Sequence, residues 1–398
     1  MIKWLIITAL YVAGVAIVGI PFLPPVTHWR QVNTKNHSVH IYAGRTQGLN
    51  DGKCTIYPGA EACEDLAVDK ITGLVYLGCG SLAGRLDYYP PQGHRNINTT
   101  ESIRDGIFIF NPKNGEVTEL AVRYRPDLDL VLHGLGVYYP EFAKDERLLF
   151  FVNHQRKKSF ISIFKYIIGS DVIFHEGDVE APAINTPNGV VPLSPTSFIV
   201  TNDHHFRKGF WRDFENNKAP LPWSNVVSCD FSSGQVFCDT LDQNRLSNAN
   251  GILLVENDTK LLVSESRTGL VAVYNVTGQE TKKLVFDHQV YLGASLDNLS
   301  LLPNDDVLVA AFPQREQFNA KIEDPFNSTI AVPSMAIRLK KRSNYKDHEI
   351  VFWSDGTKGA SAITTWAYHE NTNQLIGSSV VGQGILACKV TDRNVFYS

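Results

Sequence analysis

The sequence of 398 residues lacks the signatures of several common protein classes. It has no basic block beyond Lys340, Lys341 and Arg342, and its formal net charge is −4. We therefore do not expect nucleic acid as a partner, because phosphate binding needs a clustered basic surface. No G-x-S-x-G sequence occurs, which argues against a serine hydrolase of the α/β-hydrolase class. The six cysteines lack the C-x-x-C spacing of a zinc site, and helical periodicity is scarce after the N-terminus.

The N-terminus carries a long apolar run. Lys3 precedes apolar residues from Trp4 to Leu23, about enough to cross a bilayer core as one helix. No clear cleavage site follows the run, so we predict an uncleaved signal anchor over residues 1–25 and a linker over residues 26–50. The body of the protein is then luminal or extracellular and held at the membrane. A cleaved signal peptide, giving a secreted protein, is the alternative.

Two further features favour the oxidising side of a membrane. The even number of cysteines, without metal-site spacing, indicates disulfides. N-x-S/T triplets predict surface glycan sites in a secreted protein. These predicted sites are Asn36, Asn98, Asn257, Asn275 and Asn327.

The rest of the chain alternates short β-branched and aromatic runs with turn residues. LVYLGC, LLFFVNH and KLLVSES are examples, and such frequent short runs indicate an all-β protein. A unit made of a polar residue, an apolar strand, a turn and a second apolar strand recurs six times. The units begin at Asp65, His133, Asn188, Asn250, Asn298 and Ser361. Six units at roughly 50- to 70-residue intervals predict a six-bladed β-propeller over residues 51–398.

A propeller must close its ring or leave an edge strand exposed. Cys54 precedes the first unit and Cys388 lies near the end of the last, so a disulfide between them would join the two ends of the ring. Cys229 and Cys238 flank Ser233-Gly234 symmetrically and could pair across a hairpin, as could Cys63 and Cys79. These two pairings rest on weaker arguments than the closing bridge.

Polar residues recur in the same phase of successive units. In a propeller the first residues of each innermost strand line the central channel, so these side chains are expected to converge. They are Glu64, Asp65, His133, Asn188, Asn250, Asp297 and Asn298. Calcium prefers six to eight hard oxygen ligands with loose geometry, which carboxylates and amides provide. Asn-Gly and Asp-Asn pairs are also common turn formers, but turn chemistry would not require a shared phase.

Seven segments in consistent order resemble the paraoxonase/arylesterase family. They are CEDLAV, LHGLGVYY, LFFVNHQRKKSFISIFKY, NGVVPLSPTSFIVTNDHHF, NANGILL, SLDNLSLLPNDDVLV and LIGSSVVGQGILACKV. The resemblance implies a propeller whose channel holds two calcium ions and whose closing disulfide is Cys54–Cys388. The residues implied to bind the catalytic calcium are Glu64, Asn188, Asn250, Asp297 and Asn298. Asp65 and the backbone carbonyl of Leu135 would bind a second, structural calcium.

The resemblance also implies a catalytic apparatus. His133 in LHGLG and His154 in FVNHQ match the family's histidine pair, which is proposed to relay a proton from water. Asp203 in TNDHH could orient one of them. A hydrogen-bonded structural histidine is an equally good interpretation of either residue taken alone. Asn298 heads another N-x-S triplet, but a buried ligand should not be glycosylated.

Two departures from the family pattern bear on the substrate. Gly189 stands where the family usually has an aspartate that helps to hold the structural calcium, and residues 81–104 form a longer, more polar stretch near the channel mouth. We therefore do not expect the substrate-facing walls, or hydrolysis of paraoxon, to be copied from the family.

The sequence predicts a calcium-dependent hydrolase of aryl esters or lactones, in which the ion polarises the substrate carbonyl. Two other functions remain open. One is a biosynthetic propeller enzyme of the strictosidine-synthase or gluconolactonase type. The other is a non-catalytic luminal protein that binds calcium for structure alone.

Overall fold

The computed structural model describes residues 47–89, 91, 104–123, 129–217, 221–278, 282–391 and 396. The predicted anchor, most of the predicted linker, and Asn36 and Asn98 lie outside these residues. Within the described part of the chain, no helix is both long and apolar enough to span a membrane.

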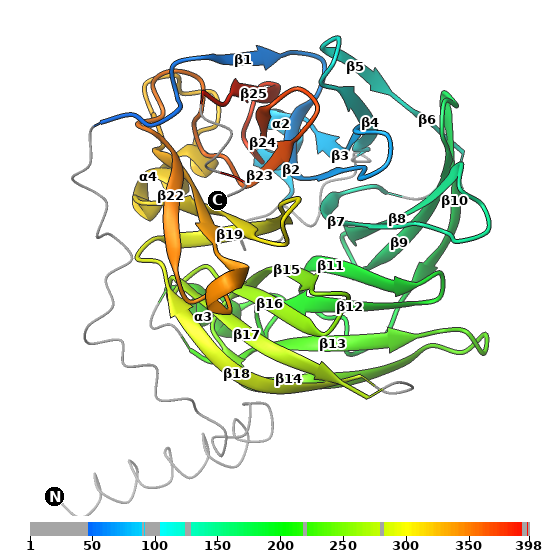
Figure 1. The fold of residues 1–398 in the computed structure, drawn as a ribbon. Helices are drawn as coiled ribbons and strands as arrows, with labels where there is room; N and C mark the ends of the chain where they lie inside the picture. The colour runs from blue at the N-terminus through cyan, green and yellow to red at the C-terminus, as the bar shows by residue number, and fades with distance from the viewer. Residues whose placement is uncertain are drawn as a thin grey trace, which may run out of the picture.

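Six sheets form a ring, which confirms the predicted six-bladed β-propeller (Figure 1), and their strands pair antiparallel except for β6. The first contains β2 (Glu61–Val68), β3 (Val75–Gly80), β4 (Gly106–Asn111) and β5 (Glu116–Glu119). The second contains β7 (Leu132–Tyr138), β8 (Glu146–His154), β9 (Ser159–Ile167) and β10 (Val172–Val179), with β6 (Ala121–Arg123) added in parallel at its outer edge. The third contains β11 (Pro187–Ser194), β12 (Ser197–Asn202), β13 (Ser224–Asp230) and β14 (Phe237–Leu246).

The fourth sheet contains β15 (Ala249–Val255), β16 (Lys260–Glu265), β17 (Leu270–Thr277) and β18 (Lys283–Tyr291). The fifth contains β19 (Ser295–Leu301), β20 (Val307–Phe312), β21 (Ser334–Leu339) and β22 (His348–Ser354). The sixth contains β23 (Thr365–His369), β24 (Gln374–Ser378) and β25 (Ile385–Lys389), completed by β1 (Cys54–Tyr57) from the other end of the propeller. Among the residues that the structure describes, the connections contain three short α-helices and one 3-10 helix: α2 (Leu82–Asp87), α3 (Phe210–Asn217), α4 (Arg315–Glu323) and η4 (Lys341–Ser343).

The position of a strand in its blade explains its sequence pattern. β20, with the sequence VLVAAF, is buried at every residue, because a strand inside a blade packs against neighbouring blades on both faces. β18 is the outermost strand of its blade, and its residues KLVFD alternate between exposed and half-buried. The apolar runs seen in the sequence are therefore interior strands of stacked blades.

The ring is closed by strand pairing and by a disulfide. Each innermost strand contacts the innermost strands of both neighbouring blades, including β23 with β2. Residues of β1 pair in antiparallel register with β25, and Cys54 is bonded to Cys388. The predicted closing bridge is thus confirmed, as are Cys63–Cys79 and Cys229–Cys238. Leu49 already pairs with Trp353, so the chain joins the propeller shortly before the predicted boundary at residue 51.

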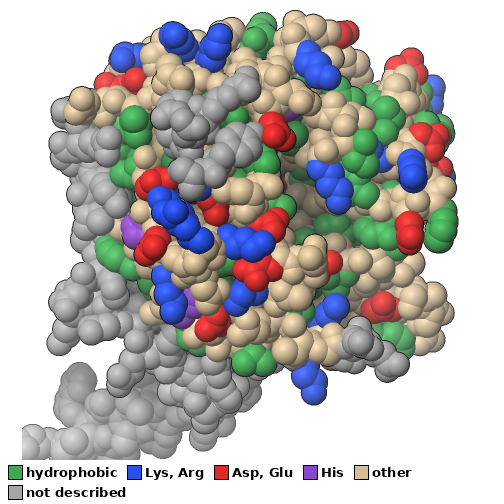
Figure 2. Space-filling model, viewed as in Figure 1, with side chains coloured by type: hydrophobic (Ala, Val, Ile, Leu, Met, Phe, Trp, Pro, Cys, Tyr) green, Lys and Arg blue, Asp and Glu red, His purple; other side chains and the backbone are tan. Residues whose placement is uncertain are grey.

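The surface carries charges of both signs. On the face shown in Figure 2, Lys and Arg side chains are interspersed with Asp and Glu side chains.

Buried ion pairs link the blades. Arg147 of β8 donates to Asp69, in the β2–β3 turn of the neighbouring blade, over 2.6 Å. Asp69 additionally accepts the hydroxyl of Tyr76 and the backbone N–H groups of Ile71 and Thr72.

Candidate active site in the central channel

Five of the six innermost strands carry an irregularity in their strand pairing at the same level of the channel. The register shifts lie at Cys63/Leu66, Leu132/Leu135, Pro187/Val190, Ala249/Ile252 and Leu296/Leu299. The residues inside these bulges are the polar pairs singled out in the sequence: Glu64-Asp65, His133-Gly134, Asn188-Gly189, Asn250-Gly251 and Asp297-Asn298. A bulge re-aims side chains and commonly occurs beside active sites. The shared phase of the repeat therefore corresponds to a shared break in the sheets.

The bulged strands lie very close together. A Cβ atom on Gly134 would lie 2.0 Å from the backbone oxygen of Asn188, so only glycine allows β7 and β11 to approach at this point. His133 of β7 also lies near Glu64 of β2, with 3.7 Å between the imidazole Nδ1 and the carboxylate Oε2. Four of the five residues predicted to hold the catalytic ion are buried, with at most 6% of their surface exposed, and the fifth, Asn250, is half-buried.

Four oxygens in this cluster are buried without a hydrogen-bond partner. They are Oε2 of Glu64 and the Oδ1 atoms of Asn188, Asn250 and Asp297. The fifth predicted ligand, Asn298, donates from Nδ2 to Oε1 of Glu64 over 2.8 Å. Buried polar atoms without a partner are costly unless something else satisfies them. Unsatisfied carboxylate and amide oxygens are the kind of donor that calcium prefers, so these residues fit the ion that the sequence predicts.

The electrostatics of the two carboxylates agree with a cation site. Burial, followed by the charges of Asp297 and Asp65, raises the pKa of Glu64 well above its usual value. Burial and the charge of Asp65 likewise raise the pKa of Asp297. A bound cation would relieve both effects. No cluster of three or more His, Cys, Asp or Glu side chains suited to a metal occurs in the described part of the chain, and the predicted set depends instead on amide oxygens beside two carboxylates.

Hydroxyl groups hold the backbone of the predicted ligands in place. Thr201 donates to the carbonyl of Asn250 over 2.7 Å, and Ser264 donates to the carbonyl of Asp297 over 2.6 Å. Thr364 completes the pattern by donating to the carbonyl of Glu64 over 2.6 Å. In each pair the hydroxyl and the ligand residue belong to adjacent blades, so these contacts fix the blades relative to one another at the level of the site.

Asp65 and Leu135, assigned to the second ion, have a different environment. Oδ2 of Asp65 accepts the backbone N–H of Leu135 over 2.9 Å, while Oδ1 accepts the N–H of Leu66 and the hydroxyl of Thr365. Asp65 and Leu135 are therefore brought together, through a hydrogen bond. The assignment of a second ion to them is not tested by this contact and stays a prediction.

The two predicted histidines lie side by side, with ring centroids 5.3 Å apart. Nδ1 of His133 is 2.7 Å from the hydroxyl of Tyr89, and Nδ1 of His154 is 2.9 Å from the hydroxyl of Ser159. Both Nε2 atoms are buried without a hydrogen-bond partner. Burial lowers the pKa of His133 to about 3, and burial together with the neighbouring ring lowers that of His154. Both rings are therefore neutral at physiological pH.

A buried ion pair supports the strand that carries His133. Arg85 of α2 lies 2.8 Å from Oδ2 of Asp105. The backbone of Leu132 is bonded to both members of the pair, because its N–H donates to Asp105 and its carbonyl accepts from Arg85. The residue before His133 is thus held at both of its backbone polar groups.

Asp203 does not form the contact with the histidine pair that the sequence predicts. The histidines bond instead to Tyr89 and Ser159, as described above. The carboxylate of Asp203 lies 2.8 Å from Nδ1 of His204 and 3.3 Å from Arg212. Burial would raise the pKa of Asp203, but these two neighbours reverse the effect and hold it below its usual value. Asp203 still favours the protonated forms of His133 and His154 through its charge.

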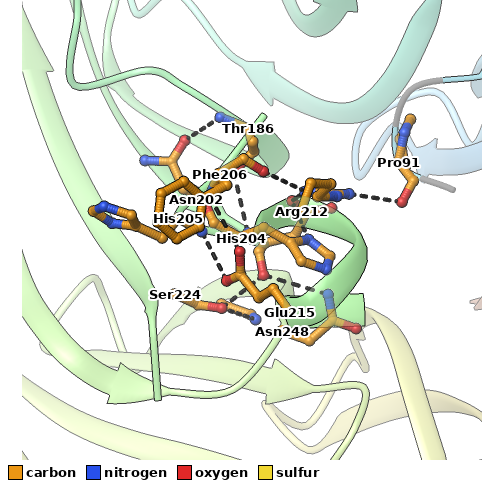
Figure 3. Close-up of polar contacts among 12 residues, drawn as sticks. Pro91, Thr186, Asn202, His204, His205, Phe206, Arg212, Glu215, Ser224 and Asn248 are labelled. Atoms are coloured by element: carbon orange, nitrogen blue, oxygen red, sulfur yellow. Dashed lines mark hydrogen bonds and ion pairs between the residues drawn. The ribbon is translucent and has the colours of Figure 1, made fainter. Parts of the chain in front are cut away.

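The network around Asp203 joins α3 to the chain beyond α2. Arg212 also donates to the backbone carbonyl of Pro91 over 2.8 Å (Figure 3). Glu215, one turn further along α3, accepts the backbone N–H groups of His205 and Phe206. Burial raises the pKa of Glu215 to about 7. This network fixes α3 beside Pro91.

Several contributors to the site were missed from the sequence. Tyr89 and Arg85 lie in the stretch that departs from the family pattern, where no motif singles them out. Ser159 could have been found, because β8 and β9 form a hairpin in which His154 and Ser159 are directly opposite. The hydroxyl contacts between blades could not, since they join residues far apart in the chain.

The predicted glycan sites within the described residues lie on different strands and turns. Asn257 is exposed in the β15–β16 turn, and Asn275 is half-buried on β17. The side chain of Asn327 accepts hydrogen bonds from Thr329, the third residue of its triplet. Asn298 is 3% exposed, which agrees with the expectation that it carries no glycan.

Comparison with known proteins agrees with the resemblance noted in the sequence. The family model described as arylesterase matches residues 78–381. Serum paraoxonase/arylesterase 2 of Rattus norvegicus is 26% identical over 216 residues, which cover 53% of this chain and 58% of that protein, less than two thirds of its length. The Canis lupus familiaris protein of the same name is 25% identical over 282 residues, covering 69% of this chain and 72% of that protein.

A solved structure agrees with the fold. A gluconolactonase from Xanthomonas campestris superimposes with a TM-score of 0.50 at 11% identity, covering 88% of this chain and 93% of that structure. At this identity the similarity concerns the propeller alone. Because the family model matches well over half of the sequence, this chain is a member of the paraoxonase/arylesterase family.

Proposed function

We propose that this protein is a calcium-dependent hydrolase of aryl esters or lactones. The observation that carries the proposal is the set of four buried, unpartnered oxygens in the channel beside two neutral histidines. The membership of the chain in the paraoxonase/arylesterase family supports the same conclusion.

Glu64, Asn188, Asn250, Asp297 and Asn298 would hold the catalytic ion. Calcium bound here supplies a positive charge that polarises a carbonyl oxygen and stabilises the oxyanion as it forms. The chain's own contribution is to hold the ligand oxygens close together before substrate arrives. The backbone contacts from Thr201 and Ser264 fulfil that role for two of the ligands, because pre-organised groups need not rearrange during the reaction.

The histidine pair would activate water. The water oxygen forms a bond to the carbonyl carbon while its proton moves to Nε2 of His133, and His154 then receives or returns that proton. The bond from the carbonyl carbon to the leaving oxygen breaks, and the leaving oxygen takes up a proton. Tyr89 and Ser159 orient the two rings through their Nδ1 atoms, so the Nε2 atoms remain available for this transfer.

Hydrolysis assays test the proposal. We expect the full chain to hydrolyse phenyl acetate or a member of a lactone panel, and chelation of calcium to abolish turnover. His133→Gln should lower kcat by roughly 100-fold or more, because general-base catalysis contributes on that order. Asp239→Asn, at an exposed position of β14, is the control and should leave turnover unchanged. Turnover that survives chelation would refute the calcium-dependent mechanism, and calcium binding without turnover of any substrate would indicate a non-catalytic protein.

We also propose that the propeller faces the lumen or the exterior, held at the membrane by residues 1–25. The three disulfides support an oxidising compartment. Asn257, exposed in a turn, is the glycan site we expect to be used first. Glycosidase treatment of the protein from a secretory host, followed by mass measurement, tests the glycans; fractionation of membranes after an alkaline wash tests the anchor.

A further inference from the structure

Asp65 differs from its neighbour Glu64 in how its oxygens are satisfied. Glu64 presents an unpartnered Oε2, whereas Asp65 accepts three hydrogen bonds from groups of the protein. A carboxylate has about four lone-pair sites. Three donors with partial positive charge therefore already occupy most of the positions from which Asp65 could bind a cation.

A second ligand is missing on β11. Gly189 has no side chain, and a Cβ atom there would lie 2.9 Å from the backbone oxygen of Asn250 and 3.0 Å from Cγ2 of Ile252. No carboxylate can be placed here without moving β11 away from β15. The hydroxyl of Thr201 bridges these strands, since it accepts the N–H of Gly189 over 2.9 Å and donates to the carbonyl of Asn250.

These features act together at one level of the channel. The N–H of Leu135 bonds to Asp65 from β7, and Thr365 bonds to it from β23, so Asp65 links β2 to both neighbouring innermost strands. A second ion would have the structural role of joining adjacent blades at the channel. The protein performs it with hydrogen bonds.

We infer that this chain binds one calcium ion in its channel and that the hydrogen-bonded network centred on Asp65 replaces the second. The inference rests on the calcium site of the proposed function, which it takes to be occupied by the first ion. It reverses the expectation, drawn from the family resemblance, that Asp65 and Leu135 hold a structural ion. The residues at that position do not fit a metal, because the oxygens of Asp65 are already bonded and β11 offers glycine.

Counting bound calcium in the purified full chain tests this inference. The protein is equilibrated with calcium, passed into metal-free buffer, and analysed by atomic emission for calcium per chain. We expect one ion. Two ions would overturn the inference while leaving the proposed function intact. No ion would overturn the proposed calcium site, and the inference with it, so the two failures can be told apart.

Two variants extend the measurement of calcium ions bound per chain. Asp65→Asn replaces a carboxylate oxygen with a donor that faces another donor, so it should lower the urea midpoint of unfolding and leave the count at one. Asp297→Asn removes a charge from the first site and should lower calcium occupancy at limiting calcium. Loss of a calcium ion in Asp65→Asn, relative to the parent chain, would overturn the inference. If Asp65→Asn does not fold, the count in the parent chain still decides the question.

Discussion

Closure of the ring by Cys54–Cys388 allows a stability difference to be worked out. This bridge joins residues 334 positions apart, whereas Cys229–Cys238 joins residues 9 apart. A disulfide restricts the unfolded chain, and in the chain-entropy model its effect grows as 1.5RT multiplied by the logarithm of loop length. The constant part cancels between the two bridges. The closing bridge should therefore stabilise the protein by about 3 kcal/mol more than the hairpin bridge.

The two bridges are well matched in other respects. Each joins two directly opposite residues of an antiparallel pair. Each also joins one fully buried cysteine, Cys388 or Cys229, to a half-buried one. Replacing both members of a bridge by alanine should therefore cost similar packing energy in the two cases.

The assay is urea unfolding of the two double-alanine variants, followed by tryptophan fluorescence and by circular dichroism, with refolding measured alongside. We expect Cys54→Ala/Cys388→Ala to lose about 3 kcal/mol more free energy of unfolding than Cys229→Ala/Cys238→Ala. Equal losses would refute the reasoning, because they would show that closing the long loop does not restrict the unfolded chain. A larger loss from the hairpin bridge would refute it more strongly.

Three further substitutions test contacts between elements. Asp69→Asn should lower the free energy of unfolding by about 3 kcal/mol at pH 7, because it breaks a buried ion pair with Arg147. Burial opposes ionisation of Asp69, but Arg147 and N–H donors hold the pKa of Asp69 below its usual value. The stabilisation by ionised Asp69 is therefore present above about pH 4 and is lost as pH falls through the lowered pKa. The urea midpoints of the parent chain and of Asp69→Asn, measured between pH 3 and 7, should converge at the acid end. A difference between the two midpoints that stays constant with pH would contradict this. Ser264→Ala should lower the free energy of unfolding by about 1 kcal/mol and weaken calcium binding, because the carbonyl of Asp297 loses its hydrogen-bond donor. Calorimetric titration measures the calcium affinity, and an unchanged affinity would exclude a positioning role for Ser264. Arg85→Met leaves the buried carboxylate of Asp105 without its ion-pair partner, so it should lower the free energy of unfolding by about 3–5 kcal/mol and lower kcat. A thermally stable, fully active variant would contradict this prediction.

Much of the architecture could be predicted because it repeats. Alternation and burial patterns recur in every blade, so six units of apolar strands predict six sheets whatever the details of each turn. The polar pairs could be predicted for the same reason: Asn188, Asn250 and Asp297 occupy equivalent positions in successive units, and equivalent positions in a ring point at a common centre. Even the closing disulfide follows from the need to cover an edge strand.

What the sequence determined by itself was therefore the periodic part of the molecule: six blades, the shared level of the polar ring, and the cysteines that close it. Only the tertiary structure decided the partners of single side chains, such as Tyr89 with His133, Arg212 with Asp203, and Leu135 with Asp65. These partners come from loops and neighbouring blades with no fixed spacing in the chain. Hydrogen bonds act over about 3 Å, so a small displacement of one strand against the next decides whether a carboxylate meets an N–H group or remains open to a cation.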